Sequence, residues 1–445
     1  MIRSLDARRL GLEAVAAAMA RPPERVAPEI HAAVDDIVRA VRERGDEALL
    51  EYTAKLDGFD ATSMSMLAIG RDEMAEAAST APAAVRAALT YAAARIERYH
   101  AAAAPRSWRM TDEHGSVLGQ EVRPLDRVGL YIPGGRAAYP STVLMTAIPA
   151  RVAGVREIVL VTPPGADGRV DPIVLAAAGV AGVTEGYRIG GGQAVAALAY
   201  GTKTIRRVDK VVGPGNIYVA LAKRRVFGDV GIDMIAGPSE VLVVAEASAR
   251  ADWVAADMLA QAEHDPMARA VLVSDSPDLL AAVETELARQ LHALPRRTIA
   301  AESLTANGAL ILVGNIDDAI ELANRLAPEH LELLVRQPEA LLSRVRHAGA
   351  VFLGGYTPEV VGDYVAGPNH VLPTGGTARF SSPLSTDDFV KRSSIIEYSP
   401  PGLAAALPHL RALTRVEGLT GHGAAAELRM GTGPATAETD GGHGA

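Results

Sequence analysis

Strand-like and helix-like segments alternate along most of this chain, and this alternation constrains its fold more than any other feature. The apolar run Val128 to Ile132 leads into the turn Pro133-Gly134-Gly135, and further alternating segments follow. Expected strands cover 157–162, 185–189, 210–212, 240–245, 271–273, 310–313, 331–335 and 350–353; expected helices cover 141–153, 172–181, 193–200, 216–227, 251–262, 277–291, 316–326 and 338–347. This pattern predicts an α/β fold whose parallel sheets are connected by helical crossovers, in two halves of similar size.

The two ends of the chain have a different texture. Residues 30–44 and 82–99 repeat apolar positions at helical spacing, so the first hundred residues are expected to be helical. From Arg379 onward the pattern predicts a small helical tail. Beyond Gly431 the sequence is rich in glycine, threonine and alanine, and we expect it to be disordered.

The 445 residues include eleven histidines and no cysteine. Thiolate nucleophiles, disulfides and thiolate metal ligands are therefore excluded, and chemistry must depend on histidine, carboxylate, amide, a metal or a bound cofactor. The formal net charge of −9 gives no basic surface for nucleic acid. No apolar run is long enough for a membrane span, and the first residues lack the apolar core of a signal peptide, so a cytoplasmic protein is expected.

Two glycine loops each follow a strand and open a helix: Gly190-Gly191-Gly192-Gln193 and Gly213-Pro214-Gly215-Asn216. Backbone N–H groups at a helix N-terminus favour a phosphate or another anion. Neither loop fits the dinucleotide fingerprint, because Tyr218 occupies the third glycine position of the second loop. The alternative is that both are only tight turns between strand and helix.

Polar side chains that suit a metal occur in three separate places. Gln261 and His264 are three residues apart on an expected helix, so they share a face and can grip one ion, although glutamine is an uncommon zinc ligand. Asp363, in a glycine-flanked loop, and His422, near the C-terminus, would complete an oxygen and nitrogen ligand set. Spacing alone does not bring together four residues so distant in the chain.

Glu329 and His330 lie side by side between an expected helix and an expected strand. On an irregular turn both can face a cleft and serve as base and proton shuttle. The alternative is a histidine that interacts with a helix dipole beside a solvated Glu329. Ser239 suits a helix cap, a turn or a ligand contact, and lacks the Gly-x-Ser-x-Gly setting of a nucleophile. The histidines without such neighbours are interpreted as surface or structural, namely His31, His100, His114, His292, His347, His409 and His443.

Taken together, these segments resemble the histidinol dehydrogenase family from about residue 35 to residue 430. The most specific stretch is residues 232–241, with the sequence Ile-Asp-Met-Ile-Ala-Gly-Pro-Ser-Glu-Val. The other matching stretches are residues 213–216, 327–330, 362–364, 367–374 and 417–422. Such a set in this order is not expected by chance.

The resemblance implies an enzyme that oxidises L-histidinol to L-histidine through L-histidinal, the last step of histidine biosynthesis, with NAD and one zinc per subunit. The implied zinc ligands are Gln261, His264, Asp363 and His422. The implied catalytic pair is Glu329 and His330. The implied NAD contacts are Tyr131, Gln193 and Asn216. The implied substrate contacts are Ser239, Gln261, His264, His330, Asp363, Glu417 and His422, and His370 lies in a motif close to them.

The family fold implies two Rossmann-like parallel-sheet domains with small helical N- and C-terminal segments, in a domain-swapped homodimer. The expected divisions are a segment 1–29, a first domain 30–126 plus 238–380 with the zinc and catalytic residues, a second domain 127–237 with the NAD loops, a segment 381–430 that reaches the partner subunit, and a disordered tail 431–445. Glu417 and His422 would then act in the partner's site.

The family mechanism implies that His330 accepts the alcohol proton, that Glu329 activates water, and that zinc positions the substrate. Aldehyde oxidation often uses a cysteine adduct, and a chain without cysteine is left with direct hydration of the aldehyde. Three alternatives stay open on the residues alone. They are a related zinc and NAD dehydrogenase for another amino or sulfonated alcohol, a zinc hydrolase, and a binding protein without catalysis.

Overall fold

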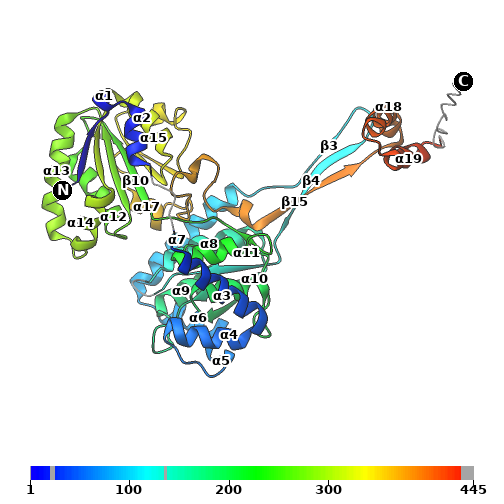
Figure 1. Ribbon diagram of the computed structural model, residues 1–445, viewed down its shortest axis with the longest axis horizontal. Coiled ribbons are helices and arrows are strands. Elements are labelled where there is room, and N and C mark those ends of the chain that lie inside the picture. Colours follow the sequence, from blue (N-terminus) through cyan, green and yellow to red (C-terminus); the bar gives the residue numbers. More distant parts are fainter. Residues whose placement is uncertain (1, 21–25, 135–137, 432–445) are drawn as a thin grey trace, which may run out of the picture. The chain divides into compact units, whose positions relative to one another are not determined.

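Two six-stranded sheets with helices on both faces form most of this protein (Figure 1). A computed structural model describes residues 2–20, 26–134 and 138–431. It divides into a larger unit, made of residues up to 104 together with 124–389, and a smaller unit, made of residues 105–123 together with the chain from 390 onward. Both six-stranded sheets belong to the larger unit.

The first sheet, called sheet A here, has the order β1-β12-β11-β10-β13-β14, and all its strand pairs are parallel. Its strands are β1 (Arg3–Asp6), β10 (Glu240–Ala245), β11 (Arg269–Ser274), β12 (Ala309–Leu312), β13 (His330–Leu334) and β14 (Ala350–Leu353). Every residue of β10 and β13 is buried, as expected for parallel strands covered on both faces. Five of these strands lie within two residues of the segments predicted from sequence.

Helices cover both faces of sheet A. One face packs against α12 (Ala251–Ala262), α13 (Pro277–Ala293) and α14 (Arg297–Asn307). The other packs against α1 (Ala7–Leu10), α2 (Leu12–Met19) and α15 (Ile316–Leu326). Two short helices, α16 (Pro338–Leu342) and α17 (Glu359–Tyr364), flank β14 in sequence. Since α17 begins only five residues after β14, it stays close to that edge of the sheet.

Strand β1 was not predicted. Arg3–Asp6 has only four residues and carries two charges, so its sequence has no strand signature. It forms because it adds in parallel to β12, some 300 residues later in the chain, with Arg3 opposite Ala309. Such long-range pairing leaves no trace in local patterning.

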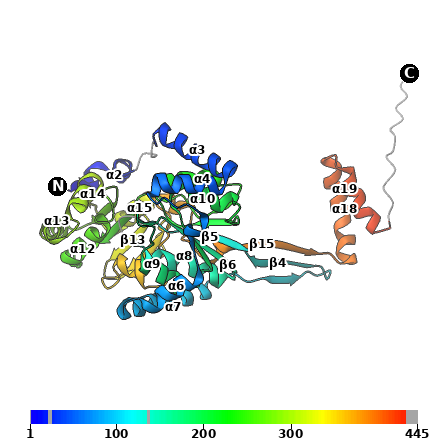
Figure 2. The same cartoon turned by 90° about the horizontal axis from the view of Figure 1, so that it is seen from below.

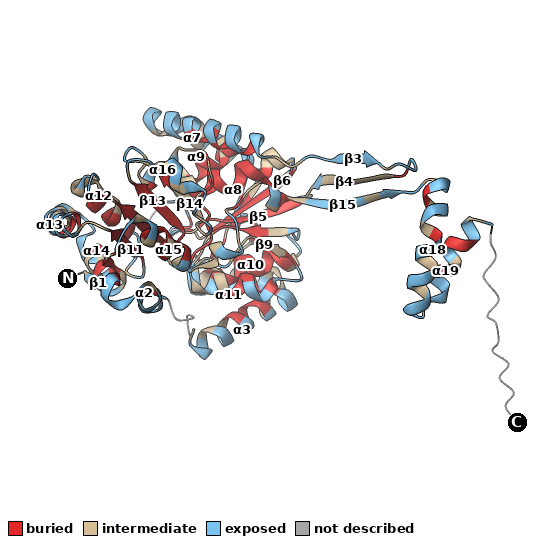
Figure 3. Ribbon diagram, turned by 90° about the horizontal axis from the view of Figure 1, so that it is seen from above, coloured by how far each residue is buried: buried red, intermediate tan, exposed pale blue. Residues whose placement is uncertain are grey.

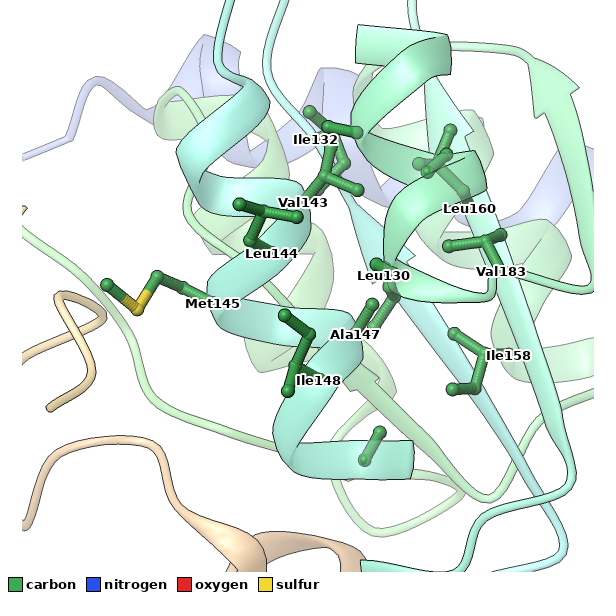
Figure 4. Packing of buried hydrophobic residues seen from close by; sticks show 14 of the residues in the cluster. Leu130, Ile132, Val143, Leu144, Met145, Ala147, Ile148, Ile158, Leu160 and Val183 are labelled. Atoms are coloured by element: carbon green, nitrogen blue, oxygen red, sulfur yellow. The ribbon is translucent and has the colours of Figure 1, made fainter. Parts of the chain in front are cut away.

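The second sheet, sheet B, has the order β2-β7-β6-β5-β8-β9. Its strands are β2 (Ala68–Ile69), β5 (Arg127–Tyr131), β6 (Glu157–Thr162), β7 (Glu185–Arg188), β8 (Lys210–Val212) and β9 (Gly231–Ile232), and only β2 is antiparallel to its neighbour. On one face, Leu130, Ile148 and Leu160 pack in a dry aliphatic core (Figure 4). That face is covered by α6 (Arg71–Thr80), α7 (Ala83–Ala102), α8 (Pro140–Ala153) and α9 (Pro172–Ala181).

The opposite face of sheet B is covered by α3 (Pro28–Arg44), α4 (Asp46–Tyr52), α10 (Gly191–Tyr200) and α11 (Ile217–Val226). A π-helical turn, Thr53–Asp57, and α5 (Met64–Leu67) follow α4. The structure thus differs from the expected grouping of 30–126 with 238–380. The apolar stripe of α3, with Val34, Val38 and Val41, packs on sheet B with α10 and α11 because those helices expose small side chains to it.

Burial follows this layering, with both sheets inside and the outer helix faces exposed (Figure 3). Alanines of α8, α9 and α10 are fully buried, so these helices lie close against their strands. Within the described ranges, no helix combines the length and apolar character needed to span a membrane.

The smaller unit is a three-stranded sheet followed by two helices, where only a helical tail was expected. The sheet has the order β15-β4-β3, from β3 (Trp108–Thr111), β4 (Val117–Pro124) and β15 (Val390–Glu397). Figure 2 shows β4 and β15 side by side along their length. Helices α18 (Pro400–Val416) and α19 (Thr420–Arg429) pack on each other and close this unit. The tail predicted to be disordered lies, beyond Gly431, outside the described residues.

Candidate active site

Glu329 and His330 lie at the junction between α15 and β13. After α15 ends at Leu326, Ala327 adopts a left-handed conformation with φ of 49°, the one non-glycine residue of the described ranges with positive φ. This conformation is strained for alanine and persists only where the surroundings impose it. The turn directs the next side chains inward, so Glu329 and His330 are only 5% and 3% exposed. The alternative with a solvated Glu329 is therefore wrong.

The backbone of Glu240 holds both side chains. Its N–H donates to Glu329 Oε2 over 2.8 Å, and its carbonyl oxygen lies 3.0 Å from His330 Nδ1. Because a carbonyl only accepts, Nδ1 carries the proton of the neutral ring and Nε2 keeps its lone pair. Burial lowers the pKa of His330 to about 4, which keeps the ring neutral at pH 7. Nε2 is therefore ready to accept a proton.

Helix α17 brings two carboxylates to the same ring. His330 Nε2 lies 3.9 Å from Asp363 Oδ1, and Nδ1 lies 3.5 Å from Glu359 Oε1. One ligand atom from each of these three residues lies within 4.8 Å of the other two, close enough to hold a metal ion. Glu359 was not identified from the sequence. It lies one turn before Asp363 only because residues 359–364 form the helix α17.

Gln261 lies in the last turn of α12 and is fully buried, yet neither its Oε1 nor its Nε2 has a hydrogen-bond partner. A buried amide without partners costs about 1–3 kcal/mol, so its oxygen is suited to a ligand that is not part of the chain. His264 follows α12 in a turn, where its N–H donates to Gln261 O over 3.3 Å, and it is exposed. Gln261 and His264 were expected to share one face of a helix. In the structure His264 instead lies in the turn after α12.

His264 lies within electrostatic range of both His330 and His370, and a positive charge on it would lower the pKa of each. His370 Nδ1 lies 2.9 Å from the backbone oxygen of Asp363, so this nitrogen donates, and Nε2 accepts from the Thr142 hydroxyl over 3.4 Å. Burial lowers the pKa of His370. The structure thus brings His330, Asp363 and His370 into one cluster, with His264 in electrostatic range of it.

The remaining predicted site residues come from other parts of the chain. Ser239 directly precedes β10 and is half-buried, one residue before the Glu240 backbone that holds the acid and imidazole. Glu417, at the end of α18, and His422, in the first turn of α19, belong to the smaller unit and are exposed in it.

A cavity of about 500 Å³ opens beside His330 and Asp363. His370 and His100 also line it, together with apolar groups such as Phe352. His100 is only 1% exposed, and neither ring nitrogen has a hydrogen-bond partner. From the sequence, His100 was interpreted as surface or structural; in the structure it lies on the buried side of α7, near the end of the helix.

The first glycine loop already binds groups of the chain itself. Gly190 N–H donates to Asp57 Oδ2 over 3.1 Å, and Gly191 N–H donates to the Tyr131 hydroxyl over 3.1 Å. Gln193 Nε2 also donates to Asp57, while its Oε1 is buried without a partner. The sequence suggested that these N–H groups bind a phosphate. In the structure they are instead bonded to Asp57 and Tyr131. Asp57, whose carboxylate takes the place of a bound anion, was not identified from the sequence.

The second glycine loop is also held by hydrogen bonds to side chains of the protein itself. Asn216 Oδ1 caps α11 by accepting from Tyr218 and Val219 N–H groups, and Gly213 N–H donates to Asp233 Oδ2 over 2.8 Å. Lys223 forms a buried ion pair with Asp233 and donates to Gly213 O over 3.0 Å. Hydrogen bonds to Asp233, Lys223 and Asn216 thus hold the loop in place.

Comparison with known proteins shows the family to which this chain belongs. The family model described as histidinol dehydrogenase matches residues 20–430. The chain belongs to the histidinol dehydrogenase family. It is 55% identical over 395 residues to histidinol dehydrogenase of Pseudomonas savastanoi pv. phaseolicola, covering 89% of this chain and 88% of that protein. With histidinol dehydrogenase of Moorella thermoacetica it shares 54% identity over 400 residues, covering 90% and 94%.

The fold agrees as well. A crystal structure of histidinol dehydrogenase from Elizabethkingia anophelis matches with a TM-score of 0.92 and 34% identity, covering 97% of this chain and 98% of that one. The family and the α/β fold with parallel-sheet domains, both expected from sequence, are confirmed.

His100 should make stability depend on pH. Burial lowers its pKa from 6.5 to about 4, so as pH falls the unfolded chain takes up the proton first. The contribution of neutral His100 to the free energy of unfolding is fully present above pH 6.5 and is lost as the pH falls from 6.5 to 4. In metal-free protein, His100→Leu should flatten the slope of unfolding free energy against pH in this window by up to ~1.4 kcal/mol per pH unit.

Urea titrations at several pH values measure both slopes. His31→Leu, on an exposed position of α3, is the matched control and should leave the slope as in the wild type. Equal slopes for His100→Leu and wild type would show that His100 does not stay neutral in the folded protein.

Proposed function

We propose that this protein catalyses the NAD-dependent, four-electron oxidation of L-histidinol to L-histidine through L-histidinal, the last step of histidine biosynthesis. Family membership over residues 20–430 carries this proposal, and the buried Glu329-His330 pair supports it. We also propose a cytoplasmic location, which suits a biosynthetic enzyme that uses NAD.

His330 would accept the alcohol proton at Nε2. Its Nδ1–H faces the Glu240 carbonyl, so the ring is held in the tautomer that this role needs. Glu329 would activate water for attack on the aldehyde. The Glu240 N–H holds one oxygen of the Glu329 carboxylate, which lies 3.8 Å from Nδ1 of His330. With no cysteine in the chain, hydration replaces a covalent adduct before the second oxidation.

Gln261, His264, Asp363 and His422 would hold one zinc ion per subunit. The unpartnered, fully buried amide of Gln261 supports this set, as does the closeness of His264 to Asp363 and His330. When bound, zinc would orient the imidazole and amine of the substrate, a positioning role. Although His330 and Glu359 also lie within metal distance of Asp363, we assign Nε2 of His330 to proton transfer because its partner Glu329 is held for catalysis alongside it.

Tyr131, Gln193 and Asn216 would hold NAD, which would supply the hydride acceptor for both oxidations. Burial raises the pKa of Tyr131 to about 12, so its phenol stays neutral and keeps its hydroxyl proton to donate. The unpartnered Oε1 of Gln193 lies beside it and can accept. The substrate would contact Ser239, Gln261, His264, His330, Asp363, Glu417 and His422, and Glu417 suits its cationic amine.

The active enzyme would be a domain-swapped homodimer in which Glu417 and His422 serve the partner's site. The smaller unit supports this, because it exposes large apolar side chains that a stable fold would cover. These are Trp108, Met110, Ile396, Leu413, Val416 and Leu428, each at least half exposed.

The decisive test is the number of NADH molecules formed per L-histidinol consumed, followed by absorbance before and after metal chelation. Two NADH, lost on chelation and restored by zinc, are expected. One NADH would mean that the aldehyde is released and that the role of Glu329 is wrong. No NADH with histidinol, but turnover with another amino or sulfonated alcohol, would reassign the substrate.

Glu329→Gln should impair oxidation of L-histidinal much more than oxidation of L-histidinol, because only the second step needs activated water. A loss of roughly 10²-fold or more is expected for NADH formation from supplied L-histidinal. Rapid mixing with histidinol reports the first hydride transfer separately. Glu284→Gln, an exposed position of α13, is the control. Equal losses in both steps would contradict the assignment.

Mixed dimers test whether sites are shared. One subunit carries His330→Ala and the other His422→Ala, each inactive alone. If His422 acts in the partner's site, each mixed dimer has one intact site, and an equilibrated equal mixture should regain about a quarter of wild-type activity. No recovery in dimers shown to exchange subunits would place His422 in its own subunit's site.

A further inference from the structure

A second layer of acids lies directly behind the proposed metal and catalytic residues. On β13, His330 and Glu332 are two residues apart and so point to the same face of sheet A. On α12, Asp257 precedes Gln261 by four residues, and on α17, Glu359 precedes Asp363 by four. Each of these three elements thus contributes one residue to the site and one to the layer behind it: Asp257, Glu332 and Glu359.

Glu332 is the centre of this layer. Its side chain is fully buried, and Oε1 accepts a hydrogen bond of 2.7 Å from the backbone N–H of Glu359, the first residue of α17. Oε2 receives no N–H or hydroxyl hydrogen bond within the described ranges. The carboxyl groups of Glu332 and Asp257 instead bond to each other. Glu332 therefore contacts α17 through one oxygen and α12 through its carboxyl pair.

Two ionised carboxylates cannot hydrogen-bond, because both only accept. The contact between Asp257 and Glu332 requires one proton between them. Burial raises the pKa of Asp257 to about 6 and that of Glu332 well above its usual range, in agreement with this. Within the described residues, the group that could hold a metal ion is His330, Glu359 and Asp363, which includes neither Asp257 nor Glu332.

We propose that Asp257 and Glu332, sharing one proton, are positioning residues that tie α12 to α17 across β13 and so set the separation of Gln261 and Asp363. This inference rests on the proposed zinc site. The shared proton connects α12 to Glu332, which binds the N-terminus of α17. On α12 the proposed ligand Gln261 lies one turn after Asp257, and on α17 the proposed ligand Asp363 lies one turn after Glu359. Such partners of the ligand-bearing elements commonly change metal affinity by about 10–100-fold when removed.

The test is zinc affinity, measured by competition with a chromophoric chelator on the full-length protein. Asp257→Ala removes the bridge and should weaken zinc binding about 10–100-fold. Asp257→Asn and Glu332→Gln each supply an amide N–H to the remaining carboxylate and should bind zinc nearly as wild type does. Asp252→Ala, on the same helix with its side chain 40% exposed, is the matched control.

Turnover at saturating zinc separates positioning from catalysis. Asp257→Ala should regain wild-type kcat once zinc is saturating, because neither residue touches the reacting atoms. Unchanged zinc affinity in folded Asp257→Ala, or equal losses in Asp257→Asn and Asp257→Ala, would overturn the inference. If Asp257→Ala does not fold, a tenfold loss in folded Glu332→Gln would overturn it instead. Wild-type protein that binds no zinc would overturn the proposed metal site and this inference with it.

Discussion

The peptide backbone of Glu240 is the interaction on which the site depends. Its N–H binds the Glu329 carboxylate and its carbonyl binds the His330 ring, so one residue fixes an acid and its neighbouring base. This works only because β10 and β13 are adjacent and parallel, with Val241 opposite His330. The strained conformation of Ala327 is needed to bring both side chains to that register.

The same register explains why acids can be buried so deeply in sheet A. Glu332 and Glu359 lie in the interior, where burial raises the pKa of both carboxyl groups well above the ordinary range. Such groups do not favour folding, and they persist where a site requires them. The larger unit compensates with extensive aliphatic cores on both faces of each sheet.

The regular parts of the fold could be predicted from sequence because strand and helix periods are local properties. Strands β10 and β14 match their predicted bounds, and Glu329 with His330 was recognised as a pair. Strands β1 and β15 were missed, since each pairs with a strand hundreds of residues away. The local β3-β4 hairpin was also missed, because every residue of β3 is exposed and no buried apolar face marks it. Asp57, Glu359 and Glu332 were missed because a carboxylate looks like surface until the register that buries it is known.

The smaller unit is assembled from two pieces of chain, and this has a consequence for synthesis in the cell. Strand β4 ends at Pro124, but its partner β15 begins only at Val390. At 5–20 residues per second, a nascent chain waits roughly 13–50 s on the ribosome with one edge of β4 unpaired. During that interval the larger unit can fold around its sheets, while the β3-β4 hairpin is open to wrong partners and to chaperones. Assembly of the smaller unit is thus a late event in the life of each new chain.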